Sequence, residues 1–162
     1  MKTLIADINT FKLNEHLFVK SMQTFCPNET TESMLSTIKN HCFYCFAFDE
    51  NNKVASWCRV AKPWDRKTIY VIRQIETAEK YKGKGYASAC YQAIEKHLSQ
   101  IDSARKIIAF VDDENIQSIK LHEKLGYLKS KNASKYLSNL YGWESALMFE
   151  KEICKENIVE IN

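Results

Sequence analysis

The residues best suited to chemistry in this sequence lie in a short run where glycines alternate with lysines. Lys82-Gly83-Lys84-Gly85-Tyr86-Ala87 follows a stretch rich in Ile, Val and Tyr and precedes one with helical periodicity. Glycine tolerates tight backbone geometry and places no side chain in a ligand's way. The first amides of a helix lack internal partners and lie at the positive end of its dipole. The run therefore predicts a turn that binds a phosphate or a pyrophosphate.

What the run lacks narrows the choice of ligand. A dinucleotide-binding fingerprint needs a third glycine at position 88, which is occupied by Ser88. A P-loop needs a longer spacing before its Gly-Lys pair and a Ser or Thr after it, and the sequence has neither. A helix N-terminus with solvated lysines is the plain alternative, and this run by itself leaves both interpretations open.

A second segment, beyond the next predicted strand, carries a matching pattern. It runs from Asn115 through Ser118 and Leu121 to Gly126-Tyr127. Together the two segments resemble the GNAT acetyltransferase superfamily. The cofactor motif of that family is (Gln/Arg)-x-x-Gly-x-(Gly/Ala), and its later motif is Asn-x-x-(Ala/Ser)-x-x-Leu-Tyr-x-x-x-Gly-Phe. The resemblance is firm over residues 68–130 and loose before them.

Two positions depart from the family pattern. Lys82 stands where the family has Gln or Arg, and a lysine reaches a phosphate without the bidentate fork of arginine. His122 stands where many members have the tyrosine that protonates the leaving thiolate, although some branches carry His there. His122 is therefore a candidate general acid, and a histidine with a purely structural hydrogen bond is an equal alternative.

The resemblance implies transfer of an acetyl group from acetyl-CoA to a primary amine by direct attack, without an enzyme nucleophile and without a metal. It implies that the pantetheine arm lies along the backbone of Ile75, Glu76 and Thr77, where an amide polarises the thioester carbonyl. It further implies that Asn115 and Ser118 line the thiol side. The pyrophosphate would bind the amides of Lys82, Gly83, Lys84, Gly85, Tyr86 and Ala87.

The acceptor is not readable from the sequence. A small-molecule amine or an amino acid is the first expectation, and a protein N-terminus or another macromolecule is an alternative. A third alternative is a regulatory domain that binds acyl-CoA without turnover. Whether the acyl group is acetyl or longer also stays open.

A general base is harder to assign than a cofactor site. The family often places Glu or His on the strand before the turn, so Glu76 is the catalytic candidate there. Strand alternation from Thr77 predicts Ile75, Arg73 and Val71 on one face and Glu76 on the other. Asp112 and Asp113, after the next strand, are alternatives that act through water.

Arg73 is the candidate substrate-binding residue. An arginine that faces the acceptor pocket would suit a carboxylate or a phosphate on the substrate. A salt bridge to a neighbouring element is the competing interpretation.

The elements that must position these residues follow from hydrophobic periodicity. We expect an α+β, GNAT-like fold: a central mixed, twisted sheet of about six to seven strands with about four helices on both faces. The predicted strands cover residues 2–7, 42–48, 54–61, 68–77, 106–111, 128–130 and 144–153. The predicted helices cover residues 12–25, a segment capped by Thr30 or Thr31 that carries Met34 and Ile38, residues 86–98, and a segment from Asp113 or Asn115 to Leu125. Loops are expected at Pro63-Trp64-Asp65 and at residues 131–143.

Length and composition set the wider expectations. The 162 residues predict one domain over residues 1–154, followed by a C-terminal tail of residues 155–162. The absence of a long apolar run or a signal-peptide pattern predicts a cytoplasmic protein without a membrane partner. A net charge of +3 is too small to indicate nucleic acid, and a homodimer is left open. Cys42 and Cys45 form a CxxC on a predicted strand, which points their thiols to opposite faces and argues against a metal site.

Overall fold

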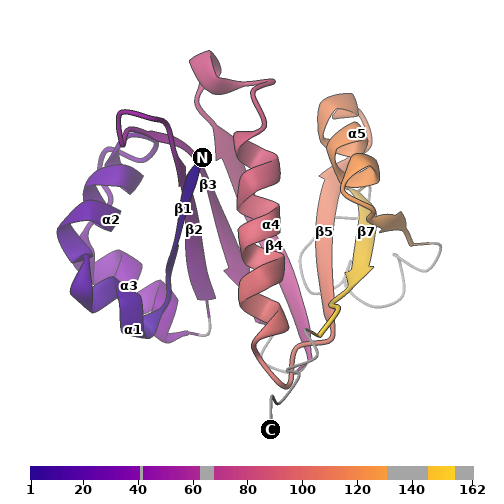
Figure 1. Cartoon of the computed structure of the whole chain (residues 1–162), viewed down its shortest axis with the longest axis horizontal. Coiled ribbons are helices and arrows are strands. Elements are labelled where there is room, and N and C mark those ends of the chain that lie inside the picture. The colour runs from indigo at the N-terminus through magenta and orange to yellow at the C-terminus, as the bar shows by residue number, and fades with distance from the viewer. Residues whose placement is uncertain (41, 63–67, 131–145, 156–162) are drawn as a thin grey trace, which may run out of the picture.

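A seven-stranded mixed sheet with the order β1-β2-β3-β4-β5-β7-β6 organises the chain (Figure 1). The computed structural model describes residues 1–40, 42–62, 68–130 and 146–155. All neighbouring strands are antiparallel except β4 and β5, which are parallel. The strands are β1 (Lys2–Ala6), β2 (Cys42–Phe48), β3 (Val54–Ala61), β4 (Ile69–Thr77), β5 (Lys106–Asp112), β6 (Leu128–Lys129) and β7 (Ala146–Glu152).

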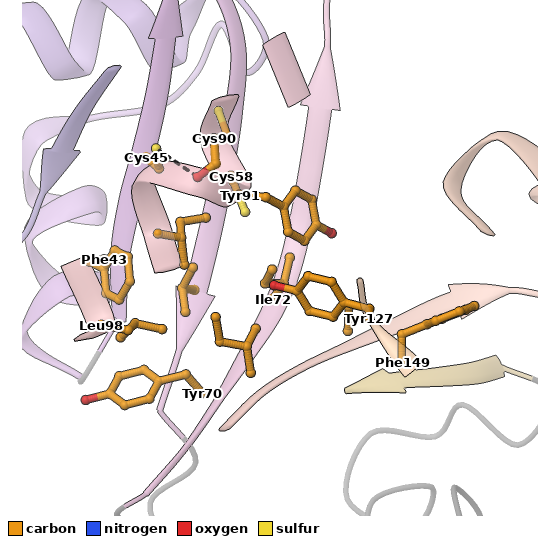
Figure 2. Packing of buried hydrophobic residues seen from close by; sticks show 14 of the residues in the cluster. Phe43, Cys45, Cys58, Tyr70, Ile72, Cys90, Tyr91, Leu98, Tyr127 and Phe149 are labelled. Atoms are coloured by element: carbon orange, nitrogen blue, oxygen red, sulfur yellow. Dashed lines mark hydrogen bonds between the residues drawn. The ribbon is translucent and has the colours of Figure 1, made fainter. Parts of the chain in front are cut away.

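Two groups of helices cover the two faces of this sheet. The helices are α1 (Ile8–Leu13), α2 (Glu15–Gln23), α3 (Thr31–Lys39), α4 (Tyr86–Ser99) and α5 (Ile116–Lys124), with a 3₁₀ turn η1 (Glu79–Tyr81). Buried residues of α1, α2 and α3 share one core cluster with Tyr44 and Phe46 of β2. Residues of α4 and α5 share another with Phe43 and Cys45 (Figure 2). Because successive strand residues face opposite sides, the two clusters lie on opposite faces. The predicted α+β fold is therefore confirmed.

The helix predicted over residues 12–25 is wrong in its bounds. The Asp7 side chain accepts hydrogen bonds from the amides of Asn9 and Thr10, so a helix already begins at Ile8. Asn14 has φ −136° and ψ 30°, which ends α1 and starts α2. Apolar spacing continues across this break, and periodicity therefore could not reveal it. The loop around Pro63, the loop of residues 131–143 and residues 156–162 of the tail lie outside the described residues.

The strand pair that carries the site separates partway along its length. Pairing between β4 and β5 ends at Ile72 and Ala109, although β4 continues to Thr77 beside β3 and β5 continues to Asp112 beside β7. Figure 1 shows the two strands meeting at one end and diverging toward the other. Beyond Ile72 in β4 and Ala109 in β5, the facing edges of the two strands therefore lie outside the parallel ladder.

A β-bulge in β4 lies where this separation begins. Arg59 pairs with Gln74, but the next residue, Val60, pairs with Ile72, which leaves Arg73 as the extra residue. A bulge shifts the alternation of faces by one. Ile75 therefore shares a face with Ile72, and the prediction that Val71 lies on the face of Ile75 is wrong.

Candidate active site

A cavity of about 480 Å³ lies where β4 and β5 diverge. Its walls come from β4, β5, β7, α4 and α5, and they include Arg73, Ile75, Tyr91, Asp112, Asn115, Ser118 and His122. Ser118 and His122 were predicted for the thiol and leaving-group side, and the structure brings both to this one cavity. Asp112 also lines it, whereas Asp113 does not belong to its walls.

The glycine turn has the backbone geometry that the sequence predicted. Gly83 and Gly85 have φ of 72° and 88°, a left-handed conformation that other residues adopt only with strain. Gly85 is the N-cap of α4 and provides no side chain to pair with the first amides of the helix. These amides therefore stay available at the positive end of the helix dipole.

The turn uses some of its own amides and leaves others unpaired. The Lys82 amide donates to the Glu79 carbonyl at 3.2 Å, and the Lys84 amide donates to the Tyr81 carbonyl at 3.3 Å. The remaining amides of the turn have no acceptor among the described residues; they belong to Gly83, Gly85, Tyr86 and Ala87. An anion bound here would satisfy these four donors.

A tyrosine hydrogen bond holds the turn against the hairpin between β2 and β3. The Tyr81 hydroxyl donates to Asp49 Oδ2 at 2.7 Å, and Asp49 Oδ1 accepts from the amides of Asn51 and Lys53. The hydrogen bond from Tyr81 lowers the pKa of Asp49. The Tyr81 ring also meets the Tyr86 ring edge-on, with 5.3 Å between centroids. Sequence reasoning missed this support, because nothing in the chain signals that residues 49 and 81 meet.

The lysine side chains in and before the turn contact a carboxylate or an aromatic ring of the protein. Lys82 Nζ lies 2.6 Å from Glu79 Oε2. Lys80 and Lys84 lie over the Tyr81 ring, at 4.7 Å and 6.0 Å from its centroid. Exposed ion pairs of this kind are weak, so a phosphate could displace Glu79 from Lys82.

His122 lines the cavity and is buried, with 1% of its surface exposed. Nδ1 lies 2.7 Å from the Ser118 carbonyl oxygen, and Nε2 lies 2.7 Å from the Tyr91 hydroxyl. A carbonyl oxygen only accepts, so these partners assign the proton to Nδ1 and make Nε2 the acceptor of the Tyr91 proton. Burial lowers the pKa of His122, which favours this neutral form.

Asn115 and Ser118 have structural roles as well as places in the cavity wall. Asn115 caps α5, and its Oδ1 accepts a hydrogen bond from the Ser118 amide at 3.0 Å. Ser118 in turn fixes His122 through its carbonyl oxygen. The later motif therefore builds the helix end that orients the histidine.

Ile75, Glu76 and Thr77 have three different environments. Ile75 lines the cavity. Thr77 Oγ1 lies 2.9 Å from the hydroxyl oxygen of Ser56, and Ser56 donates to the Glu76 carbonyl oxygen at 2.8 Å. Glu76 stands opposite Trp57, which packs in the cluster under α1, α2 and α3, so Glu76 faces that side. The structure therefore does not bring the two catalytic candidates, Glu76 and His122, to the same face.

Arg73 reaches the cavity from the bulge, as its candidate role in substrate binding requires. The sequence placed it on this face by simple alternation, but the structure places it there through the extra residue in β4. Among the described residues, no group of three or more His, Cys, Asp or Glu side chains is arranged to hold a metal ion. Cys45 instead points into the core, 3.7 Å from the Cys90 carbonyl oxygen (Figure 2).

Comparison with known proteins assigns the class. The chain matches the acetyltransferase (GNAT) family over residues 11–127 and belongs to that family. This confirms the resemblance seen in the two motifs. A search of curated proteins found no match.

Solved structures share the fold at low sequence identity. NAA60 from Arabidopsis thaliana in complex with acetyl-CoA has a TM-score of 0.61 at 14% identity, covering 94% of this chain and 98% of that one. PaiA N-acetyltransferase from Thermoplasma acidophilum in complex with coenzyme A has 0.60 at 13% identity, covering 94% and 99%. A chimera of the spermidine N-acetyltransferase SpeG from Vibrio cholerae has 0.59 at 14% identity, covering 92% and 95%. None of the helices within the described ranges is long and apolar enough to cross a membrane.

Proposed function

We propose that this protein is an N-acetyltransferase that moves the acetyl group of acetyl-CoA to a primary amine by direct attack. The observation that carries the proposal is the row of unpaired amides at Gly83, Gly85, Tyr86 and Ala87, next to the opening between β4 and β5. The amides suit the pyrophosphate of the cofactor, and the opening suits its pantetheine arm. Family membership and two neighbours solved with acetyl-CoA or coenzyme A support this choice of cofactor.

In this account the two substrates meet from opposite faces of the sheet. The cofactor lies on the side of α4 and α5, with its arm along Ile75 and its thioester near His122. The acceptor amine approaches from the side of α1, α2 and α3, where Glu76 is available as a base. A primary amine is mostly protonated at neutral pH, so a base increases the fraction that can attack. The gap left by the parted strands is the passage where they react.

A backbone amide on the separated edge of β4 would stabilise the oxyanion. The ladder between β4 and β5 ends at Ile72 and Ala109, so the edge of β4 around Ile75 lies outside that ladder. A preorganised amide is worth about 3–4 kcal/mol to an acyl-transfer transition state. No protein nucleophile is required in this mechanism.

The acceptor proposed first is a small-molecule amine or an amino acid, with Arg73 binding an anionic group on it. The spermidine N-acetyltransferase among the structural neighbours supports a small amine. A macromolecular amine is the first alternative, as a different acceptor. The second alternative is that the protein is a domain that binds acyl-CoA without transferring the acyl group. We also propose that residues 1–154 act as one domain and that the protein works in the cytoplasm.

The test is acetyl transfer followed by mass spectrometry, because the six cysteines of the chain would confuse a thiol reagent. The protein is incubated with acetyl-CoA and a panel of spermidine, free amino acids and short peptides with an unblocked N-terminus. We expect one class of acceptor to gain an acetyl group at the rate at which CoA appears. Binding of acetyl-CoA without transfer to any acceptor would favour the non-catalytic alternative.

A further inference from the structure

A buried tyrosine on α4 is joined to the candidate general acid on α5. The Tyr91 side chain is fully buried and lines the same cavity as His122, and its hydroxyl lies 2.7 Å from His122 Nε2. Figure 2 shows Tyr91 extending from α4 toward Tyr127 and Phe149, which both pack against the imidazole. Tyr91 lies outside both motifs, and nothing in its sequence neighbourhood marks it as a site residue.

The hydrogen bonds of His122 create a difficulty that Tyr91 resolves. The only proton on the neutral ring is at Nδ1, and it is directed to the Ser118 carbonyl oxygen within α5. Nε2 holds a lone pair and is covered by Tyr91. His122 alone can therefore neither give a proton to a thiolate nor take one from an amine without passing it through Tyr91.

We propose that Tyr91 and His122 form a proton relay in which the Tyr91 hydroxyl passes protons between the reacting groups and His122 Nε2. The proposal rests on the proposed acetyl transfer. When the amine attacks the thioester carbon, the new C–N bond leaves a positive charge on nitrogen. That nitrogen gives a proton to the Tyr91 oxygen while the Tyr91 proton moves to Nε2, so the imidazole becomes a cation.

The relay then runs in the opposite direction as the leaving group departs. The C–S bond breaks, the Tyr91 proton moves to the thiolate sulfur, and Nε2 returns its proton to the Tyr91 oxygen. The products are the amide and CoA with a free thiol, and both side chains recover their starting forms. One pair of residues thereby acts first as base and then as acid.

The surroundings of the pair suit transient rather than permanent charge. The ionisable groups and aromatic rings around the two side chains are Cys58, Cys90, Glu95, Tyr127, Lys151 and Phe149, and Arg73 and Asp112 line the same cavity. The Glu95 carboxylate is neutralised by Lys151 Nζ at 2.8 Å. Burial raises the pKa of Tyr91 and lowers that of His122, so the resting pair carries no charge. Because its pKa is lowered, a protonated His122 is a stronger acid than a solvent-exposed histidinium and readily returns its proton.

The test compares Tyr91→Phe with a matched control, Tyr127→Phe. Tyr127 is also buried, and its ring meets those of Tyr91 and His122 edge-on, but the hydrogen bonds of His122 go to Tyr91 and Ser118 and not to the Tyr127 hydroxyl. Each change removes one hydroxyl from the same cluster. The assay uses whichever panel amine the unsubstituted protein acetylates best, with acetyl-CoA affinity measured separately by calorimetry.

We expect Tyr91→Phe to lower kcat by about a hundredfold, the scale of a lost proton-transfer group, with acetyl-CoA affinity unchanged. Tyr127→Phe should retain the kcat of the unsubstituted protein. Adding His122→Gln to Tyr91→Phe should cost little more than the worse single change, because the two residues act as a unit. Normal kcat in Tyr91→Phe would overturn the relay while leaving acetyl transfer intact.

A second readout does not depend on the acceptor. Nitrogen NMR of the histidine side chains should find His122 with its proton on Nδ1, and Tyr91→Phe should shift the Nε2 resonance while Tyr127→Phe leaves it in place. A proton on Nε2 in the unsubstituted protein would overturn the relay. Failure of every amine in the panel would overturn the proposed function and the relay with it.

Discussion

The glycine turn and the His122 cluster, which belong to one candidate active site, are built in opposite ways. The turn presents backbone donors that no described protein group accepts. The cluster pairs both ring nitrogens of His122 and buries them. An anion that arrives from water can be bound by groups left open, since binding itself satisfies them. A proton carrier must instead have its tautomer fixed beforehand, and that requires partners and burial.

The largest effect is expected from a substitution that blocks the unpaired amides of the glycine turn. Gly85→Val adds a side chain at φ 88°, beside the donors expected to hold the diphosphate. We expect acetyl-CoA affinity to fall about a hundredfold, or ~2.7 kcal/mol, by calorimetry. The control is Gly126→Val, which imposes the same kind of strain at φ 80° after α5. Equal affinities in the two variants would show that the turn does not bind the cofactor.

The next largest effect is expected from Glu76, which lies on the sheet face opposite the His122 cluster. Glu76→Gln keeps the shape of the side chain but removes its basicity, so kcat/KM should fall at least about tenfold at neutral pH. Acetyl-CoA affinity should stay the same because Glu76 faces the helices α1, α2 and α3. Glu50→Gln, on the exposed hairpin turn, is the control. Unchanged turnover in Glu76→Gln would remove it from the mechanism and direct attention to Asp112.

Support for the turn should matter less than the turn itself. Tyr81→Phe removes the hydrogen bond to Asp49 but keeps the ring contact with Tyr86. Solvent screens the Asp49 carboxylate, so losing this hydrogen bond should weaken the turn only modestly, and only part of that effect would appear as cofactor affinity. We expect affinity to fall a few-fold, measured beside Asp49→Asn. A hundredfold loss would mean that the hairpin contact is part of the binding site.

The smallest effect is a pH dependence of the free energy of unfolding, which arises from the buried His122 cluster. Burial places the folded-state pKa of His122 below its unfolded value of about 6.5, so the unfolded chain binds more protons in that range. The free energy of unfolding should therefore fall as pH drops below about 6.5. Urea unfolding from pH 7.5 to pH 5 measures it.

His97 shares this behaviour and must be separated from His122. Burial also lowers its pKa, although the nearby Asp7 acts in the other direction. His122→Gln should flatten part of the pH dependence, and His97→Gln should flatten the remainder. A His122→Gln protein with the full pH dependence would show that His122 does not resist protonation.

The glycine turn could be predicted from the sequence better than the His122 cluster. The turn and the cap at Asn115 follow from local rules about glycine and helix ends, so a turn over residues 82–87 and a helix beginning near Asn115 could be predicted without a structure. The pairing of Tyr91 with His122 depends on how α4 and α5 pack, and the link from Tyr81 to Asp49 depends on a distant hairpin. No spacing rule reports such contacts.

The same distinction explains the errors in the fold. Strands β2 and β3 were predicted at their observed bounds, because two apolar runs joined by a short polar turn define them locally. The bulge at Arg73 was missed, because it is a property of the pairing between β3 and β4 and leaves no mark in β4 alone. The break at Asn14 was missed because apolar residues recur on both sides of it.

The central claim is tested most directly by following the backbone amides themselves. In a nitrogen–proton NMR titration with acetyl-CoA, the amides of Gly83, Gly85, Tyr86 and Ala87 should shift strongly, while those of Lys82 and Lys84 move less because they already donate within the turn. Acetyl-pantetheine, which lacks the diphosphate, should shift the resonance of Ile75 and leave the turn unchanged. Strong shifts elsewhere with a silent turn, or equal effects of both ligands on the turn, would contradict the account.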